Sequence, residues 1–103
     1  MMEGRPIKFR MLEIFNEKSP SWNYDVVRQI QSEYEDMNSD YFRDFINYDI
    51  VELATSGFLV QADSLIDLEG SFRKGSLLVK YAITQIGRDR LAELGEHSVK
   101  RRA

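Results

Sequence analysis

Cationic side chains near the C-terminal end of the sequence are the groups best suited to binding chemistry. Residues 70–103 carry eight Lys and Arg side chains against three carboxylates. Lys and Arg neutralise phosphates, and this interaction supplies much of a protein's affinity for DNA. Arg73 and Lys74 share a short polar segment, and Lys80 follows in an apolar run. These three cations predict a surface that contacts phosphates, although Arg73 and Lys74 also suit a solvated loop tip.

The middle of the chain has the opposite charge. Residues 31–69 carry ten carboxylates against the single Arg43, so the formal net charge of −3 describes no individual surface. Arg43 follows Asn38 and Ser39, and polar side chains of these types can contact base edges or phosphates. We therefore take Asn38, Ser39 and Arg43 as the candidate DNA-reading set, although the carboxylates around Arg43 would repel phosphates.

Aromatic side chains recur in the same acidic segment. Tyr41, Phe45 and Tyr48 form a stripe that is offset by one position from the expected core positions Phe42 and Ile46. One interpretation is that this second stripe packs beneath a hairpin or against the preceding helix. The other is an exposed aromatic patch, which suits a homodimer or another protein partner better than DNA.

Residues that could support catalysis are scarce. His97 is the single His and there is no Cys, so the sequence predicts no thiolate nucleophile, disulfide or cysteine-ligated metal. Neither a Gly-rich phosphate-binding motif nor the carboxylate spacing of an EF-hand is present. We expect neither an enzyme nor a protein that needs a metal or another cofactor.

The chain of 103 residues is long enough for one domain with a single modest core. No apolar run approaches the length of a membrane span, and MMEGRPIKF is too polar to be the start of a signal peptide. We therefore expect a cytoplasmic protein that makes no membrane contact.

Apolar residues at helical spacing predict three helices in the first half of the chain. Pro20 separates the first helix from the second, because proline cannot continue a helix. Asn38 or Ser39 is expected to cap the third helix, and Gly57 to end it. The first helix is expected over about residues 6–18. The second is expected from about residue 23, with an apolar stripe that reaches Met37. The third is expected to run to about residue 56.

A change of period follows Gly57. The runs FLVQADSLID and SLLVKYAIT are rich in residues that favour strands. Gly70 and Gly75 bracket a turn between them, with Arg73 and Lys74 at its tip. The pattern predicts a long hairpin with a basic end.

A last helix is expected after the hairpin. Thr84 can cap it, and Gly95 is expected to end it just after Leu94. The resulting domain would cover residues 1–95, and residues 96–103 would form a flexible basic tail. Three helices, a hairpin and a final helix predict a mostly α fold with a small antiparallel hairpin, namely a winged helix-turn-helix with a three-helix core, a β-wing and a C-terminal helix.

Three segments resemble the PadR-like family of winged helix-turn-helix transcriptional regulators: SPSWNYDVVRQI, IVELATSGFLV and KYAITQIGRDRLAEL. The resemblance covers roughly residues 7–95 and implies DNA binding, generally as a dimer. Asn23 stands where the family commonly has Gly, and the long C-terminal dimerisation helices of many family members are absent.

Two functions follow from these patterns. The first is a regulator that reads double-stranded DNA with the third helix and the basic wing, using Asn38, Ser39, Arg43, Arg73, Lys74 and Lys80. The second is a winged-helix interaction module that docks a protein on Tyr41, Phe45 and Tyr48 without binding DNA.

Overall fold

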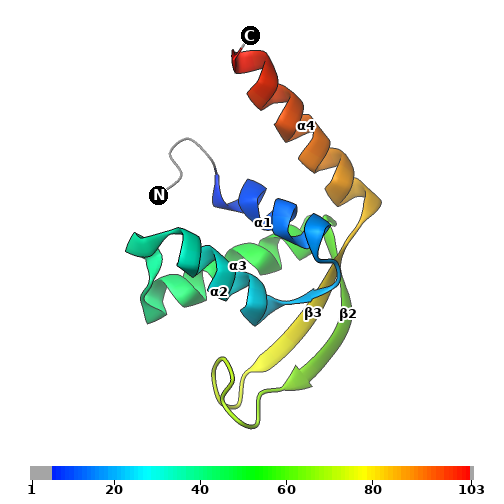
Figure 1. Ribbon diagram of the computed structural model, residues 1–103. Coiled ribbons are helices and arrows are strands. Elements are labelled where there is room, and N and C mark those ends of the chain that lie inside the picture. The colour runs from blue at the N-terminus through cyan, green and yellow to red at the C-terminus, as the bar shows by residue number, and fades with distance from the viewer. Residues whose placement is uncertain (1–5, 103) are drawn as a thin grey trace.

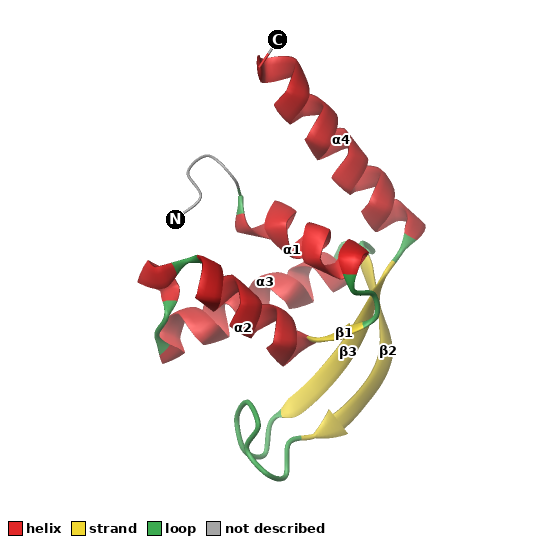
Figure 2. Ribbon diagram, viewed as in Figure 1, coloured by secondary structure: helices red, strands yellow, loops and turns green. Residues whose placement is uncertain are grey.

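Three helices pack together in the middle of the molecule, a small twisted sheet extends away from them on one side, and a fourth helix projects on the opposite side (Figure 1; Figure 2). The structure, a computed structural model, describes the backbone of residues 6–102 and the side chains of residues 6–95. Its elements are α1 (Ile7–Glu17), β1 (Ser21–Trp22), α2 (Asn23–Glu33), the 3-10 turn η1 (Glu35–Met37), α3 (Asp40–Thr55), β2 (Leu59–Ile66), β3 (Leu77–Ile83) and α4 (Gln85–Arg102).

The sheet is antiparallel, with the strand order β1-β3-β2. The expected hairpin is confirmed: β2 and β3 pair from Leu59 opposite Ile83 to Ile66 opposite Leu77, with an irregularity between Gln61 and Asp63. The short strand β1 was not expected, because two residues carry no strand periodicity and become a strand only by pairing with β3. The whole arrangement is mostly helical and consistent with a winged-helix-like topology.

The core lies between the first three helices and the inner face of β3. Phe15 of α1 meets Tyr81 of β3 edge to face, with ring centroids 6.4 Å apart. Burial of each large apolar side chain contributes roughly 1.5–3 kcal/mol. The fully buried side chains include Met11, Leu12, Ile14, Phe15, Val26, Val27, Ile30, Ile46 and Ile50.

A buried amide joins the helical layer to the sheet. Asn23, at the start of α2, is only 3% exposed. Its Nδ2 donates to Oδ1 of Asn47 in α3 at 2.8 Å, and its Oδ1 accepts from the backbone N–H of Val79 in β3 at 3.0 Å. The residue that departs from the PadR-like pattern thus satisfies polar groups on two other elements, as buried polar groups require.

A two-pronged ion pair fixes α1 against α2. Nε and Nη2 of Arg10 donate to the two carboxylate oxygens of Glu33 at 2.7 and 2.8 Å. This hydrogen bonding to Glu33 raises the pKa of the Arg10 guanidinium, against the opposing effect of desolvation. Paired geometry of this kind is directional as well as charged, so it sets how the two helices cross.

The passage from β3 into α4 depends on Thr84 and Gly87. Oγ1 of Thr84 accepts from the N–H of Gly87 at 3.0 Å and donates to the carbonyl of Gly57 at 2.7 Å, so the predicted cap is confirmed. A Cβ at Gly87 would collide with the carbonyl of Phe58 and lie 2.8 Å from Cγ1 of Ile83. Glycine at position 87 therefore permits close packing of α4 on the end of the hairpin.

The last helix is longer than expected. Its backbone continues to Arg102, so the prediction that Gly95 ends it is wrong. Among the described residues, the glycines with positive φ are Gly57, Gly70 and Gly75, and a helix-ending glycine needs that conformation. The predicted flexible tail, residues 96–103, lies outside the part of the chain whose side chains are described. None of the described helices has the length and apolar character needed to cross a bilayer.

Candidate nucleic-acid interface

The N-terminal end of α3 is capped as expected. Oγ of Ser39 accepts from the backbone N–H of Phe42 at 3.3 Å. The carbonyl of Ser39 accepts from the side chain of Gln31 at 3.1 Å, which ties this end of α3 to α2. Asn38 and Ser39 are both exposed. They therefore remain accessible at the start of the helix.

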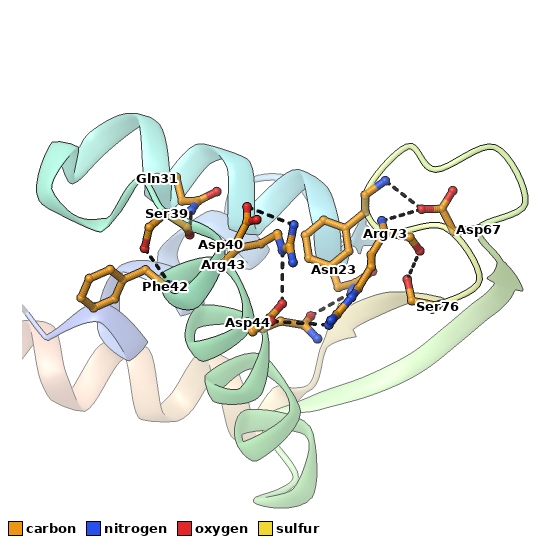
Figure 3. Close-up of polar contacts among 12 residues, drawn as sticks. Asn23, Gln31, Ser39, Asp40, Phe42, Arg43, Asp44, Asp67, Arg73 and Ser76 are labelled. Atoms are coloured by element: carbon orange, nitrogen blue, oxygen red, sulfur yellow. Dashed lines mark hydrogen bonds and ion pairs between the residues drawn. The ribbon is translucent and has the colours of Figure 1, made fainter.

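Arg43 has a different environment from the one expected of a base-reading residue. Its side chain is only 20% exposed and lies over the ring of Phe72, 5.4 Å from the centroid. Nε lies 3.2 Å from Oδ1 of Asp44, and Nη1 lies 3.4 Å from Oδ1 of Asp40 (Figure 3). The charge of Arg43 is thus already neutralised within the molecule, and its guanidinium holds the wing loop against α3.

The wing loop, residues 67–76, folds around one buried carboxylate. Oδ1 of Asp67 accepts from the N–H groups of Gly70 and Ser71 at 2.9 and 2.8 Å. Oδ2 accepts from those of Phe72 and Arg73 at 2.8 and 2.7 Å. Desolvation acts to raise the pKa of Asp67, but these four hydrogen bonds together hold the pKa below its ordinary value. The loop therefore has a defined shape.

The two cations of the wing loop, Arg73 and Lys74, differ in whether a carboxylate pairs with them. Nη1 of Arg73 lies 3.4 Å from Oδ2 of Asp44, so the loop folds back to α3 and shares this carboxylate with Arg43 (Figure 3). Arg73 is nevertheless 60% exposed. Lys74 is exposed, and no ion pair is found for it among the described side chains. Lys74 is therefore the cation of the loop most available to a phosphate.

A series of cation–ring and ring–ring contacts connects the sheet to the wing loop. Nζ of Lys80 lies 5.7 Å from the ring centroid of Trp22, and Trp22 stacks on Tyr24 with centroids 6.2 Å apart. The guanidinium of Arg28 lies 5.3 Å from the Tyr24 centroid and donates to the carbonyl of Ser71. We call Lys80, Trp22, Tyr24 and Arg28 the cation–aromatic strip.

The charges of the strip are not cancelled by carboxylates in the way that Arg43 is. Within the described residues, neither Arg28 nor Lys80 forms an ion pair. Asp63 lies opposite Lys80 in the register of the hairpin, but no ion pair joins these two side chains among the described residues. A cation held over an aromatic ring keeps its charge, so the strip can attract an anion.

The outward side of α3 carries exposed aromatic rings. Tyr41, Phe45 and Tyr48 are 70%, 46% and 56% exposed, and the rings of Tyr41 and Phe45 stack with centroids 6.4 Å apart. The interpretation that this stripe packs beneath the hairpin or against α2 is therefore wrong. Ile46 and Ile50 already fill the side of α3 that faces the core. We call Tyr41, Phe45 and Tyr48 the aromatic patch.

The predicted DNA-binding residues fall into two groups. Asn38 and Ser39 lie just before α3 and Arg43 lies in its first part, while Arg73, next to Lys74 in the wing loop, joins Arg43 through Asp44. Lys80 lies apart, in the cation–aromatic strip. Sequence reasoning missed the other members of the strip: Trp22, Tyr24 and Arg28.

A signal for the strip was nevertheless present in the sequence. Tyr24 and Arg28 stand four residues apart at the start of a helix, the spacing at which helical side chains meet. The contact of Trp22 with Lys80 was hidden, because it depends on the pairing of β1 with β3.

Comparison of the chain with protein-family models, curated proteins and solved structures finds no match. Its function must therefore be inferred from the residues themselves.

Proposed function

We propose that the chain is a winged helix-turn-helix DNA-binding domain of a transcriptional regulator, and that its wing side leads the contact with double-stranded DNA. One observation carries this proposal. Arg28, Lys74 and Lys80 have no carboxylate partner among the described side chains; the contacts of the strip connect Lys80 to Arg28, and Arg28 donates to the carbonyl of Ser71 in the wing loop that carries Lys74. The resemblance to PadR-like regulators supports the same function.

The electrostatics favour the wing over α3 as the leading element. Each Lys or Arg that neutralises a phosphate releases bound counterions, and this release drives nonspecific affinity for DNA. Arg43 and Arg73 would first have to leave Asp44, whereas Lys74 and Lys80 are available at once. Asn38 and Ser39 add uncharged contacts at the exposed start of α3 once the wing has bound.

An amide NMR titration with a mixed-sequence DNA duplex tests this proposal. At low salt we expect shifts concentrated in residues 22–28 and 71–80, with smaller shifts in 38–43, and a steep loss of binding near physiological salt. The absence of shifts at low salt, where nonspecific attraction is strongest, would contradict DNA binding.

A matched pair of variants makes the titration specific. Lys74→Ala should weaken binding, because it removes a free cation from the wing loop. Arg88→Ala removes an exposed cation from α4, away from the strip, and should leave binding unchanged. Equal weakening by both variants would mean that overall charge, rather than the wing, controls the affinity.

A second candidate function is a protein-docking module, which the exposure of the aromatic patch favours. Aromatic residues are enriched in the cores of protein interfaces, and here they lie beside carboxylates that disfavour DNA. A homodimer or another protein could cover the patch.

Sedimentation of Phe45→Ser tests the homodimer. We expect wild-type protein to self-associate and Phe45→Ser to remain a folded monomer. Val60→Ser is the control, since Val60 is similarly exposed on β2, at 53%, and this change should not alter association. Wild-type protein that stays monomeric at every concentration would exclude the homodimer.

A further inference from the structure

Two guanidinium groups from different elements converge on one carboxylate between α3 and the wing loop. Nε of Arg43, in α3, lies 3.2 Å from Oδ1 of Asp44, and Nη1 of Arg73, in the wing loop, lies 3.4 Å from Oδ2 of the same Asp44 (Figure 3). The side chains of Asp44 and Arg73 are 48% and 60% exposed, so solvent reaches this contact. The carboxylate of Asp44 thus occupies a surface position where two cations meet.

Both guanidinium groups are held in place by contacts other than Asp44. Arg43 lies over the ring of Phe72, 5.4 Å from the centroid. The backbone N–H of Arg73 donates to Oδ2 of the buried Asp67 at 2.7 Å, which fixes the backbone from which its side chain extends. We therefore expect the two cations to stay close together when Asp44 loses its charge.

A phosphate of the DNA backbone can take the place of this carboxylate. Arg binds phosphate oxygens through paired, directional hydrogen bonds, and a phosphate between two guanidinium groups can accept from both. Ion pairs that solvent reaches contribute little to stability, so exchanging Asp44 for another anion costs little. We propose that Arg43 and Arg73 form a phosphate-binding site, that Asp44 occupies it in the free protein, and that Asp44 thereby limits the affinity for double-stranded DNA.

The limit arises because a displaced Asp44 stays near the incoming phosphate. Asp44 follows Arg43 directly in α3, so its charge remains within a few residues of the site and repels the phosphate. Asp40, 3.4 Å from Nη1 of Arg43, adds to this repulsion, so Arg73 is the cation that the loss of Asp44 frees more completely. This inference rests on the proposed binding of DNA and adds how the protein restrains it.

Removing the charge of Asp44 should therefore raise the affinity for DNA. The variant is Asp44→Asn, which keeps the size of the side chain, and the probe is a labelled mixed-sequence duplex followed by fluorescence anisotropy over a salt series. At about 0.1 M salt we expect Asp44→Asn to bind about five- to tenfold more tightly than wild type. Its salt slope should be steeper by about 1, because Arg73 becomes an additional phosphate contact.

A matched variant shows whether the loss of any carboxylate has the same effect. Asp36→Asn removes one charge from the exposed turn η1, before the start of α3. No ion pair is found for Asp36 among the described side chains. Its removal should raise the affinity less than about twofold and leave the salt slope unchanged, because salt screens a distant surface charge.

Arg73→Ala separates the phosphate site from the effect of net charge. In the wild-type background it should weaken binding by about twofold at most, because Asp44 already pairs with Arg73. In the Asp44→Asn background it should weaken binding about five- to tenfold and so remove the gain. Amide NMR signals of residues 70–73 should keep their positions in Asp44→Asn; if they do not, the site needs Asp44 to form and the inference is overturned.

The outcomes distinguish this inference from the proposed function. If wild type binds the duplex and Asp44→Asn gains no more affinity than Asp36→Asn, the inference is overturned and DNA binding stands. A gain that persists when Arg73→Ala is added to Asp44→Asn would also overturn it, because the effect would then come from net charge alone. Failure of both wild type and Asp44→Asn to bind at low salt would overturn the inference and the proposed function together.

Discussion

The outward half of α3 and the cation–aromatic strip both combine aromatic rings with cations, but they combine them in opposite ways. On α3, Arg43 is turned toward the wing loop and neutralised by Asp40 and Asp44, while the rings of the aromatic patch are left exposed. In the strip, the rings hold the cations Lys80 and Arg28, and no carboxylate cancels them within the described residues.

This difference shows that the availability of a cation depends on its neighbours more than on its position in a fold. The helix α3 uses its one cation, Arg43, to hold the wing loop in place. The strip, of which only Lys80 was predicted from the sequence, keeps cations that no carboxylate neutralises within the described residues. The following changes test this contrast, either by altering one of the two regions or by altering the contact that joins them.

The largest effect is expected when the free cations of the wing side are removed together. Arg28→Ala, Lys74→Ala and Lys80→Ala combined should weaken DNA binding roughly 100-fold at about 0.1 M salt and lower the salt slope by about 3, since each lost phosphate contact lowers it by about 1. Fluorescence anisotropy over a salt series measures both quantities. The double variant Arg88→Ala and Arg90→Ala, on α4, should change neither; if it matches the triple variant, the strip has no special role.

Asn23 hydrogen-bonds to both α3 and β3, so a change at this residue should destabilise both regions at once. Asn23→Ala leaves the N–H of Val79 and the side chain of Asn47 without their buried partner, which should lower the free energy of unfolding by about 1–3 kcal/mol. Urea denaturation measures this change. Asn16→Ala, at an exposed position of α1, is the control and should cost less than about 0.5 kcal/mol. Equal effects of the two changes would mean that Asn23 does not join the layers.

A more local effect is expected at Asp67 as the pH falls. Because its pKa is lowered in the folded protein, its contribution to stability is complete above the ordinary aspartate pKa of about 3.9 and is lost as the pH falls through the lowered value. Amide NMR signals of Gly70 to Arg73 should therefore keep their positions at pH 5 and move together only below about pH 4.

The variant Asp67→Ala provides the corresponding test at neutral pH. It should disorder the wing loop while α1 to α3 stay folded, because the four N–H groups of the loop lose their shared acceptor. Asp63→Ala, at an exposed position on β2, should leave the loop unchanged. A loop that survives Asp67→Ala would mean that other contacts determine its shape.

The smallest effect is expected for a change at Arg43, and it tests the difference between α3 and the cation–aromatic strip most directly. Arg43→Ala should lower the free energy of unfolding by about 1 kcal/mol, since it removes the contact with Phe72 and the pairing with Asp44. It should leave affinity for DNA nearly unchanged. Thermal unfolding and anisotropy measure the two quantities. A large loss of affinity with unchanged stability would return Arg43 to the role of a DNA-reading residue.

The parts of the fold that the sequence predicted are those decided by neighbouring residues. Ser39 caps α3 through an N–H three residues away, and Thr84 caps α4 in the same way. The left-handed conformations of Gly57, Gly70 and Gly75 place the end of α3 and the two sides of the wing turn where expected. Such signals are visible in sequence because both partners lie within a few positions.

The parts that could not be predicted depend on residues far apart in the chain. Arg43 meets Phe72, and Arg73 meets Asp44, only because the wing loop folds back onto α3. Trp22 finds Lys80 through a strand of two residues that has no pattern of its own. The length of α4 was predicted wrongly from a local signal. Gly95 was expected to end its helix as Gly57 ends α3, but Gly57 has a positive φ and Gly95 does not.

Because Gly87 fits closely against the carbonyl of Phe58, the start of α4 is held against the end of the hairpin, and the helix would move with it as a rigid body. The helix has 18 residues and is therefore about 27 Å long at about 1.5 Å per residue. It starts from β3, the strand that carries Lys80. A tilt of about 5° at Gly87 would displace the far end of such a helix by about 2 Å. A small movement of β3 at the wing side would thus be magnified at Arg102, at the opposite end of the molecule (Figure 1).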